Sequence, residues 1–347
     1  MRQPAIGVIR QMQDEQDAAD ELGLPWTSRF FCPAGTQGSV VEQAPQTANS
    51  WGHFKRSYYR WLSEQVPNHD VILLRYAMYD PFQLQFVRNC PVPIVSMHHT
   101  LEVKELLSHR NAKSVARATL ERALGPHTLA HCVAHAGCTM QVAEHQRLRS
   151  RGPDKPVYHY SNGALYGPSP VIEADHADGP PELFILSSRY AHWMGLDLLL
   201  ESAKRTDRDF RLHIGGHLDK EQQAAVAQDD RFIAHGFLDR AGMDAVLARS
   251  LIGLSAFGIH RKSFTEGNTL KVREYLRAGV PVYAGYRDVF DEAFAYYRNG
   301  PADMDAILDY AEGLRGVDRH AVSQAARPII EKKAVLSSIY ADIQETM

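Results

Sequence analysis

The sequence has 347 residues, 44% of them hydrophobic and 23% charged, with a net charge of −3, which excludes a fibrous or disordered chain. Its length exceeds the roughly 250–300 residues at which a single core stops growing, so two domains are predicted. The four cysteines are too few and too scattered for a disulfide scaffold or a Cys-x-x-Cys zinc site. No stretch approaches the roughly 18 apolar residues of a membrane-spanning helix, and we expect a soluble, cytoplasmic protein.

The net charge conceals an uneven distribution along the chain. Residues 1–170 carry 17 basic and 14 acidic side chains, whereas residues 171–347 carry 21 and 27. The basic excess is greatest in residues 88–155, where 10 basic side chains and 7 histidines accompany 5 acidic ones. This stretch indicates either an ordinary solvated face or peripheral contact with an anionic partner, such as a membrane surface or a phosphate. Nucleic acid is not expected as a partner, because no aromatic residues are interleaved with the charges.

Apolar runs alternate with helical patterns along the chain, which is typical of parallel sheets covered by helices. In the first half, strands are predicted at residues 5–9, 71–76, 94–97 and 132–135. Helices are predicted at residues 58–65, 81–89 and 114–124. Asp80 and Pro81 form a strong helix start, because aspartate caps a helix and proline suits its first turn.

Glycines and prolines accumulate in residues 150–181, which predicts a linker and a domain boundary. Beyond it, strands are predicted at residues 183–187, 210–214, 232–235, 251–255 and 282–284, and an amphipathic run covers residues 329–343. We therefore predict an α/β protein with two Rossmann-like, doubly wound domains that face a central cleft. The domains cover residues 1–165 and 166–326, and a C-terminal helix over residues 327–347 is expected to pack back toward the first domain.

The segment from Thr265 to Tyr275 is the most informative part of the sequence. If a helix starts near Gly267, Glu266 and Glu274 fall on one face of it, about two turns of 5.4 Å apart. Two carboxylates at this separation can each accept hydrogen bonds from vicinal hydroxyls, and the helix N-terminus between them favours a phosphate. A nucleotide sugar carries these groups in this order, with hydroxyls on the sugar, then a diphosphate, then hydroxyls on the ribose. On an exposed helix, the same pair of glutamates is also compatible with a purely structural role.

Glu266-x7-Glu274, followed by Tyr-Leu-x-Ala-Gly-Val-Pro-Val, resembles the donor-binding signature of GT-B retaining glycosyltransferases of the family-4-like group. Further segments follow in the order expected for that group, namely Ser161-Asn162-Gly163, Leu186-Ser187-Ser188-Arg189, Met194-Gly195-Leu196, Leu212-His213-Ile214-Gly215-Gly216 and residues 232–236. Residues 70–100, which end in His98-His99-Thr100, resemble the acceptor-domain segment more weakly. The resemblance implies an acceptor-side first domain and a donor-binding second domain.

The resemblance also implies roles for individual residues. Glu266 would lie by the donor sugar, Glu274 would hold the ribose, and Arg189 would bind phosphate. His99, with His98 as the second choice, would face the transferred sugar. The implied catalytic residues are Glu266, His99 and Arg189, and the implied donor-binding residues are Glu274, Lys271, Gly267, Asn268, Thr269, Leu270 and Gly215. No metal and no other cofactor is expected.

Two departures from the family pattern keep alternatives open. The family usually has a lysine at the position of Met194, and Lys271 or Arg261 could supply the missing charge. The first loop, Arg10-Gln11-Met12, lacks the glycine pair that often occurs there. The preferred interpretation is a retaining glycosyltransferase that moves a sugar from a nucleotide sugar to an unidentified glycan, glycolipid or small molecule in polysaccharide or glycoconjugate biosynthesis. The alternative is a catalytically impaired paralogue that binds nucleotide sugars and acts as a partner or scaffold; an epimerase or phosphorylase is less favoured.

Overall fold

The computed structural model describes residues 6–47, 50–109, 111–167, 171–175 and 179–347. The chain forms two compact units, one made of residues 1–161 with 332–347 and the other of residues 162–331. Position 5 of the first predicted strand lies outside the described residues. The same is true of positions 168–170 and 176–178 of the predicted linker.

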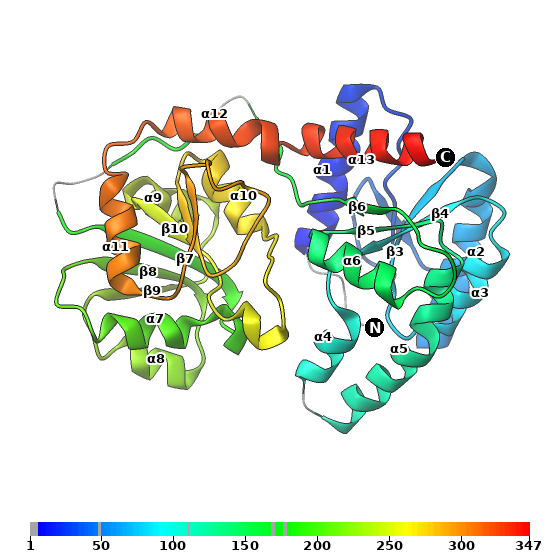
Figure 1. The fold of residues 1–347 in the computed structure, drawn as a ribbon, viewed down its shortest axis with the longest axis horizontal. Coiled ribbons are helices and arrows are strands. Elements are labelled where there is room, and N and C mark those ends of the chain that lie inside the picture. The colour runs from blue at the N-terminus through cyan, green and yellow to red at the C-terminus, as the bar shows by residue number, and fades with distance from the viewer. Residues whose placement is uncertain (1–5, 48–49, 110, 168–170, 176–178) are drawn as a thin grey trace. The chain divides into compact units, whose positions relative to one another are not determined.

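The first unit contains a four-stranded parallel sheet in the order β3-β4-β5-β6 (Figure 1). Its strands are β3 (Ile72–Arg75), β4 (Ile94–His98), β5 (Ala134–Gly137) and β6 (Val157–His159), and a separate parallel pair is formed by β1 (Phe30–Cys32) and β2 (Val41–Gln43). Its helices are α1 (Ile6–Leu22), α2 (Trp51–Gln65), α3 (Pro81–Asn89), α4 (Glu102–Ser108), α5 (Ala112–Ala130), α6 (Met140–Arg149) and α13 (Lys332–Thr346). Because the sheet is parallel, the carboxyl ends of its strands share one edge.

The strand predicted at residues 5–9 is wrong, because residues 6–22 form helix α1. The apolar pattern does not stop at Ile9 but continues at helical spacing to Ala18 and Ala19, which are fully buried. Helix α1 packs against α13 at the other end of the sequence. Arg10-Gln11-Met12 is therefore helical and is not a loop that follows a strand.

Two other predictions are corrected in detail. The predicted linker over residues 150–181 contains strand β6, which pairs with β5 through Ala136 and Tyr158. The single C-terminal helix predicted over residues 327–347 is divided, because α12 (Arg319–Ile330) ends before Glu331 and α13 begins after it. The backbone of Glu331 is extended, with φ −64° and ψ 131°.

The second unit contains a six-stranded parallel sheet in the order β12-β11-β10-β7-β8-β9 (Figure 1). Its strands are β7 (Glu182–Arg189), β8 (Arg211–His217), β9 (Phe232–Gly236), β10 (Ile252–Leu254), β11 (Val282–Ala284) and β12 (Tyr297–Asn299). Its helices are α7 (Leu196–Ala203), α8 (Lys220–Val226), α9 (Arg240–Arg249), α10 (Leu270–Arg277), α11 (Met304–Gly313) and α12. Counted from β7, this is the doubly wound strand order of a Rossmann domain.

A buried ion pair joins α10 to the segment that follows β11. Arg273 and Asp288 are fully buried, and the two guanidinium nitrogens of Arg273 lie 2.5 and 2.7 Å from the two carboxylate oxygens of Asp288. Removal of either partner would leave an unpaired charge in the core. Arg273, in the middle of the Glu-x7-Glu segment, therefore has a structural role.

Candidate functional site

The order of the strands in the second unit reverses the direction of winding between β7 and β10. These two strands are neighbours, with Ile252 opposite Leu183 and Leu254 opposite Ile185. From β7 the chain continues to β8 on one side, whereas from β10 it continues to β11 on the other side. Ligands of open α/β sheets bind where the direction of winding reverses in this way. The two segments that leave this point are joined, because the Phe257 N–H donates to the Met194 carbonyl at 3.0 Å.

Arg189, a predicted phosphate ligand, is exposed at the carboxyl end of β7, opposite His217 of β8. Both glycines of the predicted turn lie within β8. Gly215 is buried, and a Cβ there would contact Leu186 at 2.9 Å. Gly216 requires glycine, since its φ is +113° and a Cβ there would lie 1.6 Å from the carbonyl oxygen of Ser187.

The structure contradicts the prediction that Glu266 and Glu274 share one helical face. Helix α10 begins only at Leu270, and Glu266 lies before it in an extended segment that forms a bridge with Arg287. The backbone N–H of Gly267 donates to the Arg287 carbonyl at 2.9 Å, and a carboxylate oxygen of Glu266 lies 3.6 Å from the Arg287 guanidinium. This pairing joins residues distant in sequence, and helical spacing alone does not reveal it.

In the predicted diphosphate-binding segment, Gly267, Asn268 and Thr269 contact other parts of the unit, whereas Leu270 is 36% exposed. Gly267 lies against the ring of Tyr286, where a Cβ would come within 2.5 Å of a ring carbon, so this position requires glycine. The side-chain oxygen of Asn268 accepts from the backbone N–H of Asn162 at 2.8 Å. The hydroxyl of Thr269 lies 2.9 Å from that of Tyr286.

The N-terminus of α10 presents backbone N–H groups to a ligand. Thr269 stands at the N-cap position but makes no side-chain cap hydrogen bond among the described residues. The first N–H groups of a helix have no partner within the helix, and they carry a partial positive charge. The amides at Leu270 and Lys271 therefore remain available to an anionic ligand at the winding reversal.

Lys271, in the first turn of α10, is the predicted donor-binding cation. Its ammonium nitrogen lies 3.8 Å from the sulfur of Met194, a fully buried core residue. Burial lowers the pKa of Lys271 to about 8. The second cation considered from the sequence, Arg261, is paired with a carboxylate of this chain, because its guanidinium lies 2.7 and 3.0 Å from the carboxylate oxygens of Asp197.

Glu274, the predicted ribose ligand, lies one turn further along α10. One of its carboxylate oxygens, Oε2, accepts from Arg277 at 2.6 Å and from Arg240 at 3.3 Å. Among the described residues, the other oxygen, Oε1, makes no hydrogen bond or ion pair with a side chain, and it can accept from a hydroxyl. Two arginines thus orient the carboxylate and leave one face of it for a ligand.

In the first unit, the two predicted histidines have different surroundings. His98 is buried at the end of β4, with Nδ1 2.6 Å from Glu102 and Nε2 3.0 Å from the hydroxyl of Ser96. His99, the next residue, is exposed. Of the two, His99 is the accessible one, and its role toward the transferred sugar stays a prediction.

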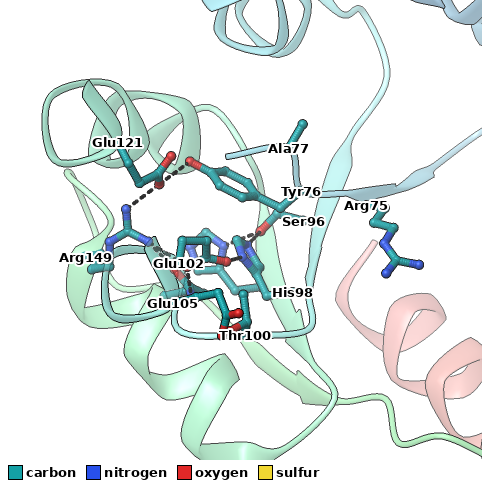
Figure 2. Close-up of polar contacts among 12 residues, drawn as sticks. Arg75, Tyr76, Ala77, Ser96, His98, Thr100, Glu102, Glu105, Glu121 and Arg149 are labelled. Carbon is teal, nitrogen blue, oxygen red and sulfur yellow. Dashed lines mark hydrogen bonds and ion pairs between the residues drawn. The ribbon is translucent and has the colours of Figure 1, made fainter. Parts of the chain in front are cut away.

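His98 belongs to a buried polar network that the sequence analysis did not find (Figure 2). The guanidinium of Arg149 lies between two glutamates, 2.8 Å from Glu102 and 2.6 Å from Glu121. The hydroxyl of Tyr76 donates to Glu121 at 2.8 Å, and the ring of Tyr76 stacks on that of His98 with centroids 4.5 Å apart. Burial alone would raise the pKa of Glu102, but His98 and Arg149 hold it below its ordinary value.

This network ties β3 and β4 to helices α4, α5 and α6 at the carboxyl edge of the sheet. The only local signal for it is the four-residue spacing from His98 to Glu102. Glu121 and Arg149 follow much later in the chain. Their connection becomes visible only when the helices are packed.

Within the described residues, no three histidine, cysteine, aspartate or glutamate side chains are grouped as a metal site requires. Among the helices that the structure describes, none combines the length and apolarity needed to cross a bilayer.

Neither a protein-family model nor a curated protein sequence matches the chain. Many solved structures do match its fold. A glycosyltransferase from Rickettsia africae superimposes with a TM-score of 0.62 at 13% identity, covering 98% of this chain and 95% of that one. Anabaena HepE in complex with UDP and glucose gives 0.59 at 13% identity, with 96% and 95% covered.

The apo form of the lipopolysaccharide outer core galactosyltransferase WaaB gives a TM-score of 0.58 at 11% identity, with 88% and 84% covered. At these identities the likeness establishes the fold. The prediction of two Rossmann-like domains of the GT-B type is confirmed.

Proposed function

We propose that this chain is a glycosyltransferase that moves a sugar from a nucleoside diphosphate sugar to an acceptor, with retention at the anomeric carbon. The observation that carries the proposal is the winding reversal between β7 and β10, which places Arg189, Lys271 and an uncapped helix N-terminus in one unit. Structures with this fold include described glycosyltransferases and a complex with UDP and glucose, which supports a nucleotide-sugar donor.

In this proposal the diphosphate binds at the N-terminus of α10. Lys271 and the amides there oppose its charge, and Arg189 from β7 adds a second cation. Negative charge grows on the diphosphate as the glycosidic bond breaks, so groups already oriented toward it lower the barrier. The proposal assigns no resident metal or other cofactor, because these groups supply the positive charge that the leaving group needs.

The remaining predicted residues complete the assignment. Glu274 presents Oε1 to the ribose hydroxyls, and Glu266 serves the transferred sugar. His99 is assigned to the acceptor-side unit. A single carboxylate at the reacting centre agrees with displacement on one face of the sugar better than with the two-carboxylate route of glycosidases.

A second candidate function is a nucleotide-sugar-binding paralogue without turnover. One observation favours it, because the family-like lysine is replaced by Met194 and this side chain is fully buried in the core. The leaving diphosphate then meets fewer cations than the family pattern provides. Such a protein would act as a partner or scaffold.

The test combines binding with turnover. Thermal unfolding is recorded with a panel of nucleoside diphosphate sugars, and a donor at 100 times its Kd should stabilise the protein by about 2.7 kcal/mol. The stabilising donors are then incubated with glycan, glycolipid and small-molecule acceptors, and the anomeric configuration of the product is determined. Binding without turnover across the panel supports the paralogue, and epimerised free donor identifies an epimerase. Failure of every donor to stabilise the protein overturns both candidates.

We also propose that the protein acts in the cytoplasm and that the basic residues 88–155 contact an anionic membrane surface. The charge of this stretch supports the proposal, with 10 basic and 5 acidic side chains. A lipid-linked acceptor would be encountered at such a surface.

A further inference from the structure

Helix α5 buries polar as well as apolar side chains. The residues buried against the rest of the first unit are Ser114, Ala118, Glu121, Gly125, Thr128 and Leu129. The buried Glu121 joins the network of Arg149 and Tyr76 (Figure 2). A surface helix ordinarily keeps its polar residues on the outward face.

The outward face of α5 is mainly apolar. The exposed residues on it are Ala112, Val115, Ala116, Thr119, Leu120, Ala123 and His127. Their spacing of three, four, seven, eight, eleven and fifteen positions from Ala112 places them on a single stripe, about 140° wide at 3.6 residues per turn. Val115 and Leu120 are 50% and 43% exposed, although they are large aliphatic side chains.

Basic residues border this stripe on both sides. Lys113 and Arg117 lie along one edge and Arg122 lies along the other, as their positions on the helix require. Of the nearby acidic residues, Glu102 and Glu121 are buried in the network, and Glu105 of α4 is half-buried. The outward face of α5 is therefore mainly apolar at its centre and positive at its margins.

We propose that this face is a docking surface for an anionic lipid bilayer. The apolar stripe would enter the boundary between headgroups and acyl chains, while the three cations contact lipid phosphates. The inference rests on the membrane contact proposed for residues 88–155, and it assigns that contact to one face of one helix. It does not depend on the chemistry of the second unit.

Charge and composition favour a bilayer over the other possible occupants. A symmetric dimer across this face would bring Lys113, Arg117 and Arg122 of two copies together, and like charges would oppose it. The stripe contains no phenylalanine, tyrosine or tryptophan on which a nucleic acid base could stack. A bilayer with anionic headgroups satisfies both the apolar centre and the positive margins.

The test measures partition of the full chain onto sedimented vesicles. One set mixes phosphatidylglycerol with phosphatidylcholine, and the other contains phosphatidylcholine alone. The wild type should bind the anionic set at low salt and dissociate as the ionic strength rises. In Lys113→Glu/Arg122→Glu, the partition coefficient should fall at least about 25-fold, since each removed cation contributes roughly fivefold near a membrane surface.

Matched controls separate the face from general effects. Arg205→Glu/Lys220→Glu makes the same change in charge at two exposed positions of the second unit, and partition should stay within about twofold of wild type. Val115→Ser/Leu120→Ser should weaken binding even at low salt. Met140→Ser/Leu148→Ser removes two exposed side chains from α6, which are 39% and 74% exposed. This variant should bind the vesicles as well as the wild type does. Thermal unfolding of each variant confirms that it is folded.

Each outcome has a defined meaning. If the wild type binds anionic vesicles but the α5 variants bind equally well, the assignment to α5 is overturned and the broader membrane contact stands. Equal losses in the α5 variants and their controls also overturn it. Absence of wild-type binding to anionic vesicles removes both proposals, and a dimer in solution that the α5 substitutions dissociate identifies a second copy as the occupant. None of these results affects the donor-binding test.

Discussion

The ammonium nitrogen of Lys271 lies 3.8 Å from the sulfur of Met194, and the contact joins the two segments that leave the winding reversal of the second sheet. Met194 follows β7, whereas Lys271 is in the first turn of α10. A lysine in place of Met194 would bring a second ammonium against the first. Methionine instead offers its thioether sulfur, a weak acceptor, to the ammonium group of Lys271.

Lys271→Met should weaken binding of a nucleoside diphosphate. The lost contact is a hydrogen bond between charged groups, which corresponds to about 1.5–3 kcal/mol, or roughly 10- to 150-fold in Kd. Calorimetric titration measures the change. Lys220→Met removes an exposed lysine at the start of α8 and serves as the control. Equal affinity in wild type and Lys271→Met would remove Lys271 from the site.

Binding of the diphosphate should also depend on pH through Lys271. Burial disfavours its protonated form and lowers its pKa from 10.5 to about 8. Only the protonated form attracts the anion, so the affinity should decline as the pH rises above about 8, and binding should take up a proton there. In Lys271→Arg the side chain stays charged, and the decline should disappear. A Kd series from neutral to alkaline pH tests both statements.

Met194→Lys should destabilise the protein and should not create a better enzyme. The side chain at this position is fully buried, and its neighbour Lys271 carries a like charge. We expect a loss of at least about 3 kcal/mol in the free energy of unfolding. Met194→Leu keeps the volume and should lose less than about 1.5 kcal/mol. A Met194→Lys variant with wild-type stability and faster donor turnover would contradict this expectation.

Glu274→Ala should weaken binding of the free nucleoside diphosphate and of the whole donor by the same factor, because the ribose is common to both. Loss of hydrogen bonds to a charged acceptor predicts about 1.5–3 kcal/mol. Arg240→Ala removes one of the two arginines that donate to Oε2 but keeps the carboxylate. It shows whether loss of an ion pair by itself changes the affinity for the nucleotide. If Glu274→Ala leaves the affinity unchanged in a folded protein, the carboxylate serves only Arg240 and Arg277.

Arg189→Ala should lower turnover far more than donor binding. The charge on the diphosphate grows as the glycosidic bond breaks, so a cation at the end of β7 matters most in the transition state. Steady-state rates and donor Kd values are compared for wild type and variant. A parallel fall in both would show that Arg189 contributes only to ground-state binding.

Local signals predicted a large part of the fold. The helix predicted at residues 81–89 has those bounds, because Asp80 caps it through the backbone N–H of Phe82 and Pro81 occupies its first turn. The strand predicted at residues 282–284 also has its predicted bounds. The prediction was wrong where the apolar pattern had no turn residue nearby to end it. Residues 6–9 of the predicted strand are the first residues of helix α1.

The sequence by itself determined the alternation of strands and helices, the two Rossmann-like domains and the segments that contain the candidate donor residues, because each is encoded by side chains close together in the chain. The tertiary structure decided which of those residues share a surface. It removed Glu266 from the helix by pairing its backbone with Arg287, placed Lys271 against Met194, and buried Glu121 beside Arg149 so that α5 turns an apolar face outward. These relationships depend on contacts between distant residues, whose free energy is gained only when the elements pack, and no local pattern records them.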